Sequence, residues 1–229
     1  MNQQNLFLEA TTTEESRVVF YRKTYMHVAL AVLLFVAVEY VLLQIDPLVN
    51  FMLSLTEGYL WLALLGGFWV ASTFATNLSY KLDKSAQYAG LFIYVLAEAI
   101  IFVPILYFAV NYSSPAVLNQ AASLTAFLFI GLSAVAMFSK KDFSFLRSIL
   151  TIGFFVAIGL IVAGLLFGFN LGLWFSVGMI LLAAGSILYQ TSQLKNHYQP
   201  DQYVGAAVGL FAALMTMFWY ILRIFMSRD

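Results

Sequence analysis

Long apolar runs separated by short polar breaks make up most of this chain. The apolar segments cover residues 25–45, 59–79, 88–110, 116–138, 148–168, 171–194 and 203–226. About 20 apolar residues form a helix that crosses the roughly 30 Å hydrocarbon core of a bilayer. Inside lipid every backbone N–H and C=O must be hydrogen-bonded within the protein, and a helix meets this condition by itself. The pattern therefore predicts an all-α integral membrane protein with seven transmembrane helices.

The same pattern predicts the domain organisation. Residues 1–23 are polar, so we expect a cytoplasmic polar tail followed by one seven-helix transmembrane domain over residues 24–229. The shortest break is at Phe169 and Asn170. One uninterrupted helix across this break would be far longer than a bilayer is thick, so we predict two helices here.

Basic residues predict the orientation in the membrane. Of the 11 lysines and arginines, all but Arg223 and Arg228 lie in the tail or in the loops after the second, fourth and sixth segments. Cytoplasmic loops carry the excess of Lys and Arg in membrane proteins. We therefore expect a cytoplasmic N-terminus and an outside C-terminus. A seventh segment that re-enters instead of spanning would place the C-terminus in the cytoplasm.

Composition narrows the function classes. Hydrophobic residues make up 62% of the chain and charged residues 10%, whereas soluble domains carry about 25% charged residues. The net charge is zero, which gives no support for nucleic-acid binding, and the absence of cysteine excludes disulfides and thiolate metal sites. No Gly-rich phosphate loop, G-x-S-x-G or H-E-x-x-H motif is present. We expect no enzyme, no cofactor and no metal centre.

The two histidines lie in different parts of the chain. His27 lies near the cytoplasmic end of the first segment, where it is either a pH sensor or a partly solvated interfacial residue. His197 lies in a loop, and we assign it no role.

Three charged residues fall inside the predicted helices, where charge is costly and usually functional. Glu98 lies near the middle of the third segment, Glu39 in the outer part of the first, and Arg223 in the outer part of the seventh. Their depths predict that Glu39 and Arg223 meet and form a pair.

Glu98 has no basic residue at its own depth and allows two interpretations. It is either a proton or cation site that faces an internal cavity, or a hydrogen-bonding residue that fixes helix packing. Pro104 is predicted to kink the same helix near Glu98 and to release backbone carbonyls that can line a cavity.

Small residues gather in the first half of the seventh segment. Gly205 and Gly209 have the GxxxG spacing, which lets helix backbones approach closely in lipid. The spacing predicts either close packing within the bundle or a dimer face, so the oligomeric state stays open.

Several short motifs, taken together, resemble the Bax inhibitor family and within it the bacterial YccA-like branch. The resemblance covers residues from about Arg22 to Asp229. It rests on residues 22–25 (RKTY), 103–106 (VPIL), 140–146 (KKDFSFL), 185–194 (GSILYQTSQL) and 227–229 (SRD).

The resemblance implies a fold in which six helices surround a central seventh, and a location in the bacterial cytoplasmic (inner) membrane. It also implies two activities. Some members of the family act as pH-sensitive calcium leak proteins, and the YccA-like branch is linked to a membrane-bound, ATP-dependent protease that it binds and restrains.

This sequence lacks most of the residues that the resemblance implies for calcium leak. The family's acidic residue on the sixth helix falls on Gln190, and its partner acid on the seventh falls on Ala213. The basic residue expected on the second helix has only Lys81 as a candidate. A carboxylate-pair switch is therefore not expected here, and Glu98 remains the candidate titrating site.

Three hypotheses follow from the residues and the resemblance. The first is a leak or homeostasis protein for calcium or protons, with Glu98, Glu39, Gln190 and Arg223 as candidate residues of the ion pathway. The second is a non-conducting modulator of a membrane-bound protease. The third is a secondary transporter, favoured by Pro104 beside Glu98 but weakened by the lack of evident inverted repeats.

Overall fold

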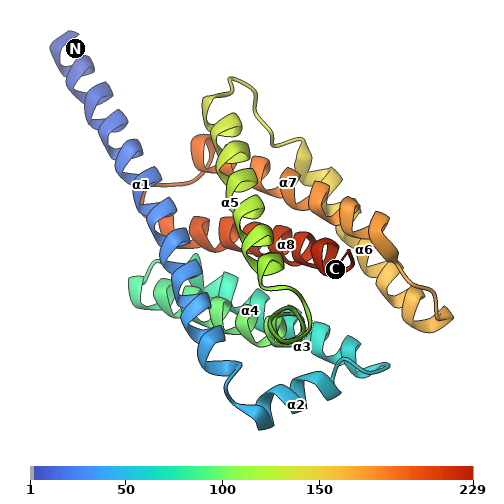
Figure 1. Cartoon of the computed structure of the whole chain (residues 1–229). Coiled ribbons are helices and arrows are strands. Elements are labelled where there is room, and N and C mark those ends of the chain that lie inside the picture. The colour runs from blue at the N-terminus through green and yellow to red at the C-terminus, as the bar shows by residue number, and fades with distance from the viewer. Residues whose placement is uncertain (1–2, 229) are drawn as a thin grey trace.

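The computed structural model describes the backbone of residues 3–228 and the side chains of residues 14–228. Over these residues the chain is entirely helical. The eight helices are α1 (Gln3–Leu42), α2 (Asp46–Ser54), α3 (Leu60–Ser79), α4 (Lys84–Tyr112), α5 (Pro115–Phe138), α6 (Leu146–Phe167), α7 (Gly172–Asn196) and α8 (Tyr203–Met226) (Figure 1). Seven of them, all except α2, are long and apolar enough to cross a membrane. The predicted all-α fold with seven spans is confirmed.

Successive spans run in alternate directions, so the loops gather at two ends of the bundle. We call the end that carries Lys23, Lys84, Lys140 and Lys195 the basic end. The other end, at which α8 finishes, is called the opposite end.

The first two helices differ from the predicted pattern. α1 runs without a break from Gln3, so the predicted tail and the first span belong to one helix. α2 was not predicted, because it lies in the break between the first two apolar segments. An acidic residue and a proline suit the first turn of a helix, and here Asp46 and Pro47 begin α2. α2 buries Val49 and Met52 against Val103 of α4.

The short break between α6 and α7 forms as predicted. α6 ends at Phe167, and Gly168 follows in the left-handed conformation with φ +70°. Glycine adopts this conformation without the steric penalty of a Cβ atom, which makes it a common helix terminator. The alternative of one long helix is therefore excluded.

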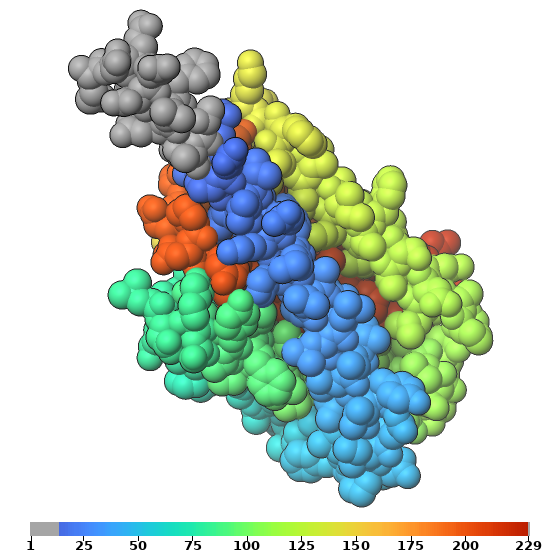
Figure 2. All heavy atoms as spheres, turned by 90° about the vertical axis from the view of Figure 1, so that its left-hand side faces the viewer, coloured from blue at the N-terminus to red at the C-terminus, as the bar shows by residue number. Residues whose placement is uncertain are grey.

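α8 is the central helix of the bundle. It packs against α1, α3, α4, α5 and α7, whereas α6 lies on the outside against α7. Within the protein 67% of the α8 span is buried, compared with 11% of the α6 span. Figure 1 shows α8 in red passing through the middle of the bundle, and in Figure 2 little of it is visible between α1 and α5.

The two glycines of the GxxxG spacing let neighbours approach α8 closely. A Cβ atom on Gly205 would lie 2.6 Å from the Tyr80 ring and 2.9 Å from the carbonyl oxygen of Ser79. A Cβ atom on Gly209 would lie 2.9 Å from the side-chain amide of Gln190. Both glycines are thus used for packing inside the chain, by α3 and α7 respectively.

α4 is the second most buried span and carries Glu98. Asp83 caps its N-terminus, accepting hydrogen bonds from the backbone N–H groups of Ser85 at 3.4 Å and Ala86 at 3.0 Å. The helix continues through Pro104 to Tyr112. Because proline has no N–H, the carbonyl of Ile100 lacks its partner within the helix.

A membrane-embedded cavity as candidate functional site

A cavity of about 770 Å³ lies between α3, α4, α6, α7 and α8, in the half of the bundle toward the opposite end. Its wall is mostly apolar and aromatic. The apolar part includes Trp61, Leu65 and Phe68 of α3, Ile101, Phe102, Ile105 and Phe108 of α4, Ile161 and Leu165 of α6, Phe175 and Met179 of α7, and Trp219 of α8.

The exposure of the lining residues shows where the cavity opens. Phe169, Asn170 and Arg223, at the opposite end, are exposed, whereas Glu98 and Phe102 are buried. The mouth therefore lies at the opposite end and the floor lies near the middle of the bundle.

Glu98 forms part of this floor and is only 5% exposed. The hydroxyl of Tyr94, one turn earlier on α4, donates a hydrogen bond to its carboxyl group. Tyr94 is held in place by edge contacts with Phe68 and Phe211. Thr216 of α8 and Pro104 also line the cavity. The cavity thus brings together Glu98, Pro104 and Arg223 among the candidates from the sequence.

Between Glu98 and the basic end the bundle is closely packed. Leu91 and Val95 of α4, Ala75 of α3, and Val208 and Phe211 of α8 belong to one continuous buried core. We call this cavity, which is closed toward the basic end, a half-channel.

Glu39 does not pair with Arg223, so that prediction is wrong. Glu39 is 4% exposed and neither of its carboxyl oxygens has a hydrogen-bond partner. It lies on the buried face of α1, one turn after Phe35, whose ring contacts Phe102 and Phe211. Arg223 is exposed at the cavity mouth. The two residues have similar depths, but their helices direct them to different places.

The two family acid positions lie together toward the basic end, without a carboxylate. The Gln190 amide packs against Gly209, one helical turn before Ala213. Tyr198 donates a long hydrogen bond of 3.4 Å to Gln190 Oε1, and its hydroxyl is 2.8 Å from that of Tyr80. The tyrosine rings stack at 6.0 Å. A neutral tyrosine–tyrosine–glutamine chain therefore occupies this position, and Lys81 is exposed to solvent.

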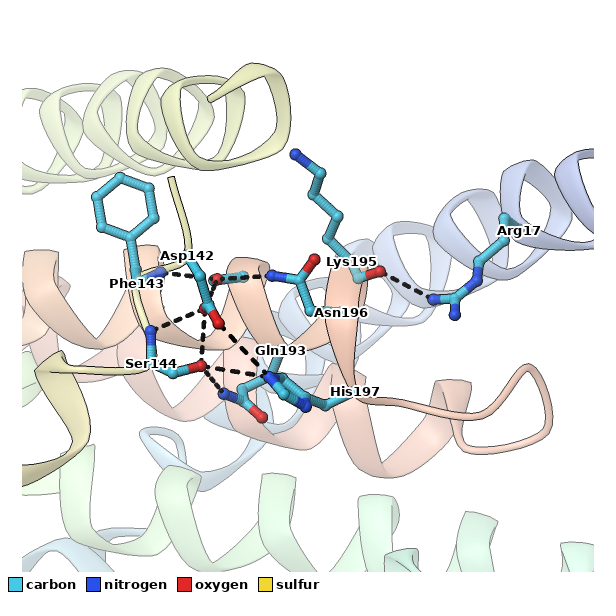
Figure 3. A network of polar contacts seen from close by, with 9 residues as sticks. Arg17, Asp142, Phe143, Ser144, Gln193, Lys195, Asn196 and His197 are labelled. Atoms are coloured by element: carbon cyan, nitrogen blue, oxygen red, sulfur yellow. Dashed lines mark hydrogen bonds and ion pairs between the residues drawn. The ribbon is translucent and has the colours of Figure 1, made fainter. Parts of the chain in front are cut away.

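A second polar network, missed in the sequence, joins the α5–α6 loop (residues 139–145) to the end of α7 (Figure 3). Asp142 Oδ1 accepts hydrogen bonds from the Ser144 hydroxyl at 2.7 Å and backbone N–H at 2.9 Å, and from the Ser192 hydroxyl at 2.9 Å. These bonds, those from Ser144 first, lower the pKa of Asp142 to about 2. Two of the motifs that carried the family resemblance, at residues 140–146 and 185–194, contain Asp142, Ser144 and Ser192. The motifs marked these residues, but the sequence did not show that they meet.

Both histidines also have partners at the basic end. His197, to which the sequence assigned no role, has its Nε2 atom 3.8 Å from Asp142 Oδ2 and 3.3 Å from the Ser144 hydroxyl. His27 is buried between Tyr88 and Tyr203, with its Nε2 3.2 Å from the Tyr88 hydroxyl. Among the described side chains no three His, Asp or Glu residues form a group that would hold a metal ion.

A family model described as "Inhibitor of apoptosis-promoting Bax1" matches residues 17–229. The chain belongs to this family, the Bax inhibitor family. The resemblance inferred from the short motifs is thereby confirmed.

Relatives in the Bax inhibitor family come from bacteria and animals. An uncharacterized protein of Pseudomonas aeruginosa is 37% identical over 110 residues, 48% of this chain and 49% of the relative. The Escherichia coli protein named "Modulator of FtsH protease YccA" is 34% identical over 116 residues, 49% of this chain and 52% of the relative. Mouse "Protein lifeguard 4" is 28% identical over 218 residues, 93% of this chain and 87% of the relative. The chain therefore spans about half the length of the two bacterial relatives.

Proposed function

We propose that this member of the Bax inhibitor family conducts a cation across the bacterial inner membrane, and that Glu98 is the titrating group of the pathway. The observation that carries the proposal is the half-channel that reaches a buried carboxyl group from the opposite end.

The position of Glu98 supports this role over a purely structural one. A charged residue at the centre of a bilayer costs about 2.5–3.5 kcal/mol on insertion scales, so such residues are usually functional. A carboxyl that only fixes packing needs no route to the surface. Glu98 has one, because it lines the cavity, whereas Glu39 does not line it.

The chemistry of the cavity favours protons over calcium. Calcium takes about 6–8 oxygen ligands, and the lining offers Glu98 as its one carboxylate. Arg223 at the mouth repels a divalent cation more strongly than a singly charged one. A proton needs only water and one titratable group. Calcium flux is therefore the second arm of the test.

The test is flux into proteoliposomes that contain a pH-sensitive or a calcium-sensitive dye. We expect proton flux with the parent protein, and a fall to the level of protein-free vesicles with Glu98→Gln. Glu39→Gln is the matched control, because it removes a buried carboxyl that does not line the cavity. Equal flux in the parent and Glu98→Gln, or an equal loss in Glu39→Gln, would overturn the role of Glu98.

A second candidate function is modulation of a membrane-bound protease. It is favoured by the similarity to the Escherichia coli protein named as a modulator of FtsH protease. The extension of α1 at the basic end is the segment we expect to meet such a partner. The test is co-purification with the FtsH protease, using a deletion of residues 1–13. This deletion leaves the hydrogen bond of 3.0 Å from Arg17 to the Lys195 carbonyl in place. Loss of the protease with this deletion, together with no flux from the parent, would support modulation alone.

The orientation belongs to the same proposal. Because basic residues gather at one end, we propose that the basic end faces the cytoplasm, and the cavity mouth then faces outside. A reporter enzyme fused after Asp229 should be active only on the outer side. Cytoplasmic activity would reverse the direction assigned to the half-channel.

A further inference from the structure

The wall of the cavity separates its polar groups into two sets. Arg223, Tyr220, Asn170 and Thr56 lie toward the mouth, and Glu98 and Thr216 lie toward the floor. Between them the wall is formed by the apolar and aromatic side chains named above. Such a distribution matches a ligand with a polar head and a long apolar body.

The depth of the cavity matches one layer of lipid chains. Its lining on α8 runs from Met226 to Thr216. A helix rises about 1.5 Å per residue, so these ten steps span roughly 15 Å. The hydrocarbon core of a bilayer is about 30 Å thick, which leaves roughly 15 Å for the acyl chains of each leaflet.

The wall of the cavity between its mouth and its floor is mostly apolar. Such a wall favours an apolar occupant over water. The surrounding bilayer supplies the acyl chains that can fill it.

Arg223 identifies the head group. Its guanidinium is exposed at the mouth, and among the described residues no carboxylate lies within ion-pair distance of it. A guanidinium binds phosphate with two parallel hydrogen bonds. The phosphate of a phospholipid lies at the boundary of the apolar core, which is also where α8 ends.

We propose that the cavity holds one acyl chain of a bilayer phospholipid, whose phosphate pairs with Arg223. The chain extends from the mouth toward Glu98 and separates Glu98 from water. Its consequence for flux, namely that conduction requires displacement of the chain, rests on the proposed function. The binding itself does not depend on flux.

The four tryptophans allow a direct test by fluorescence quenching. Trp61 and Trp219 line the cavity, with their rings stacked 6.3 Å apart. Trp69 and Trp174 are 62% and 84% exposed and face the surroundings of the bundle. The doubly substituted protein Trp69→Phe/Trp174→Phe therefore reports on the cavity, and Trp61→Phe/Trp219→Phe reports on the outer surface.

Both proteins are reconstituted in phosphatidylglycerol vesicles with plain or brominated acyl chains. Bromine quenches tryptophan only at close contact, so we expect strong quenching of both reporters. Cavity tryptophans that stay as bright in brominated as in plain vesicles, while the surface reporter is quenched, would overturn the proposal.

Two further variants of the cavity reporter separate entry into the cavity from quenching by bulk lipid. Ile161→Phe narrows the cavity, and Arg223→Gln removes the phosphate partner. We expect both to reduce quenching, whereas the same changes in the surface reporter should have no effect. Quenching that neither variant changes would show contact with bulk lipid only and would also overturn the proposal. Because no flux is measured, this outcome is distinct from a failure of the Glu98 test.

Discussion

The two halves of the bundle use their polar residues differently. Toward the basic end polar side chains are linked to one another, as in the chain from Tyr80 through Tyr198 to Gln190 and in the network around Asp142. Toward the opposite end Glu98 and Arg223 line an open cavity without forming an ion pair. Polar groups that are linked together stabilise packing, whereas groups that face a cavity can bind something else.

The two halves also differ in whether they contain the acidic residues that the family resemblance implied. The positions of the expected acid pair, Gln190 and Ala213, lie in the closely packed half and carry no charge. Glu98, the carboxyl group that lines the cavity, is in the other half. The proposed titration therefore occurs on α4 and not at the contact between α7 and α8.

The largest expected effect comes from breaking the close packing of the basic half. Gly205→Leu places atoms where the Tyr80 ring and the Ser79 carbonyl already lie. Overpacking costs about 1–3 kcal/mol, and the backbone carbonyl cannot move aside easily. We expect a clearly lower thermal unfolding temperature in detergent. Gly66→Leu is the matched control, since nothing lies within 4 Å of a Cβ atom there. Equal stability of the two variants would refute the close approach of α3 to α8.

A smaller loss is expected when the neutral network is interrupted. Tyr198→Phe removes the hydroxyl that connects Tyr80 to Gln190, so each of these two side chains loses one hydrogen bond. The cost should be about 1 kcal/mol, measured by thermal unfolding, with no change in flux. Tyr40→Phe, at a residue that is 72% exposed, is the control. A loss of flux in Tyr198→Phe would contradict this prediction, because it would show that the ion pathway passes through the basic half.

The network at the α5–α6 loop predicts a specific pH dependence. The pKa of Asp142 is lowered from 3.8 to about 2 in the folded protein. A lowered folded-state pKa contributes stability above the unfolded pKa, and this contribution is lost as the pH falls from about 4 toward 2. Unfolding temperatures of the parent and Asp142→Asn should therefore differ at neutral pH and converge in acid. A constant difference across this range would contradict the assigned hydrogen bonds.

The smallest effect is expected for His197→Ala. His197 and Asp142 are 3.8 Å apart and both side chains are 52% exposed. Exposed ion pairs of this kind contribute little, and Asp142 keeps its bonds from Ser144 and Ser192. We expect no resolvable change in unfolding temperature at neutral pH. A large loss would show that the histidine, and not the serines, holds the loop.

The sequence predicted the fold better than the site, for a physical reason. The cost of exposing polar backbone to lipid forces each long apolar run into a helix, so the seven spans follow from the pattern of apolar runs alone. The small residues of α8 predicted its close packing, and the family resemblance implied its central place. In contrast, residue depth predicts only height along a helix. Glu39 and Arg223 have similar heights but point in different directions around their helices, which depends on packing that the pattern does not contain.

The network around Asp142 shows a similar limit. Asp142 and Ser192, which belong to the motifs at residues 140–146 and 185–194, are 50 residues apart along the chain. Their contact depends on how α7 lies beside the loop, so His197 looked isolated. Glu98, by comparison, was identified because an acidic residue inside a membrane-spanning segment is costly however the helices pack.

The most direct test of the account compares the two buried carboxyls of the membrane-spanning helices. The parent protein in membranes is treated with an apolar carbodiimide, and modified glutamates are located by mass spectrometry of peptides. We predict modification of Glu98, which lines the cavity, and little or none of Glu39, which is buried at 4% exposure outside it. Modification of Glu39 as fast as Glu98, or an unmodified Glu98, would contradict the claim that the cavity gives access to Glu98.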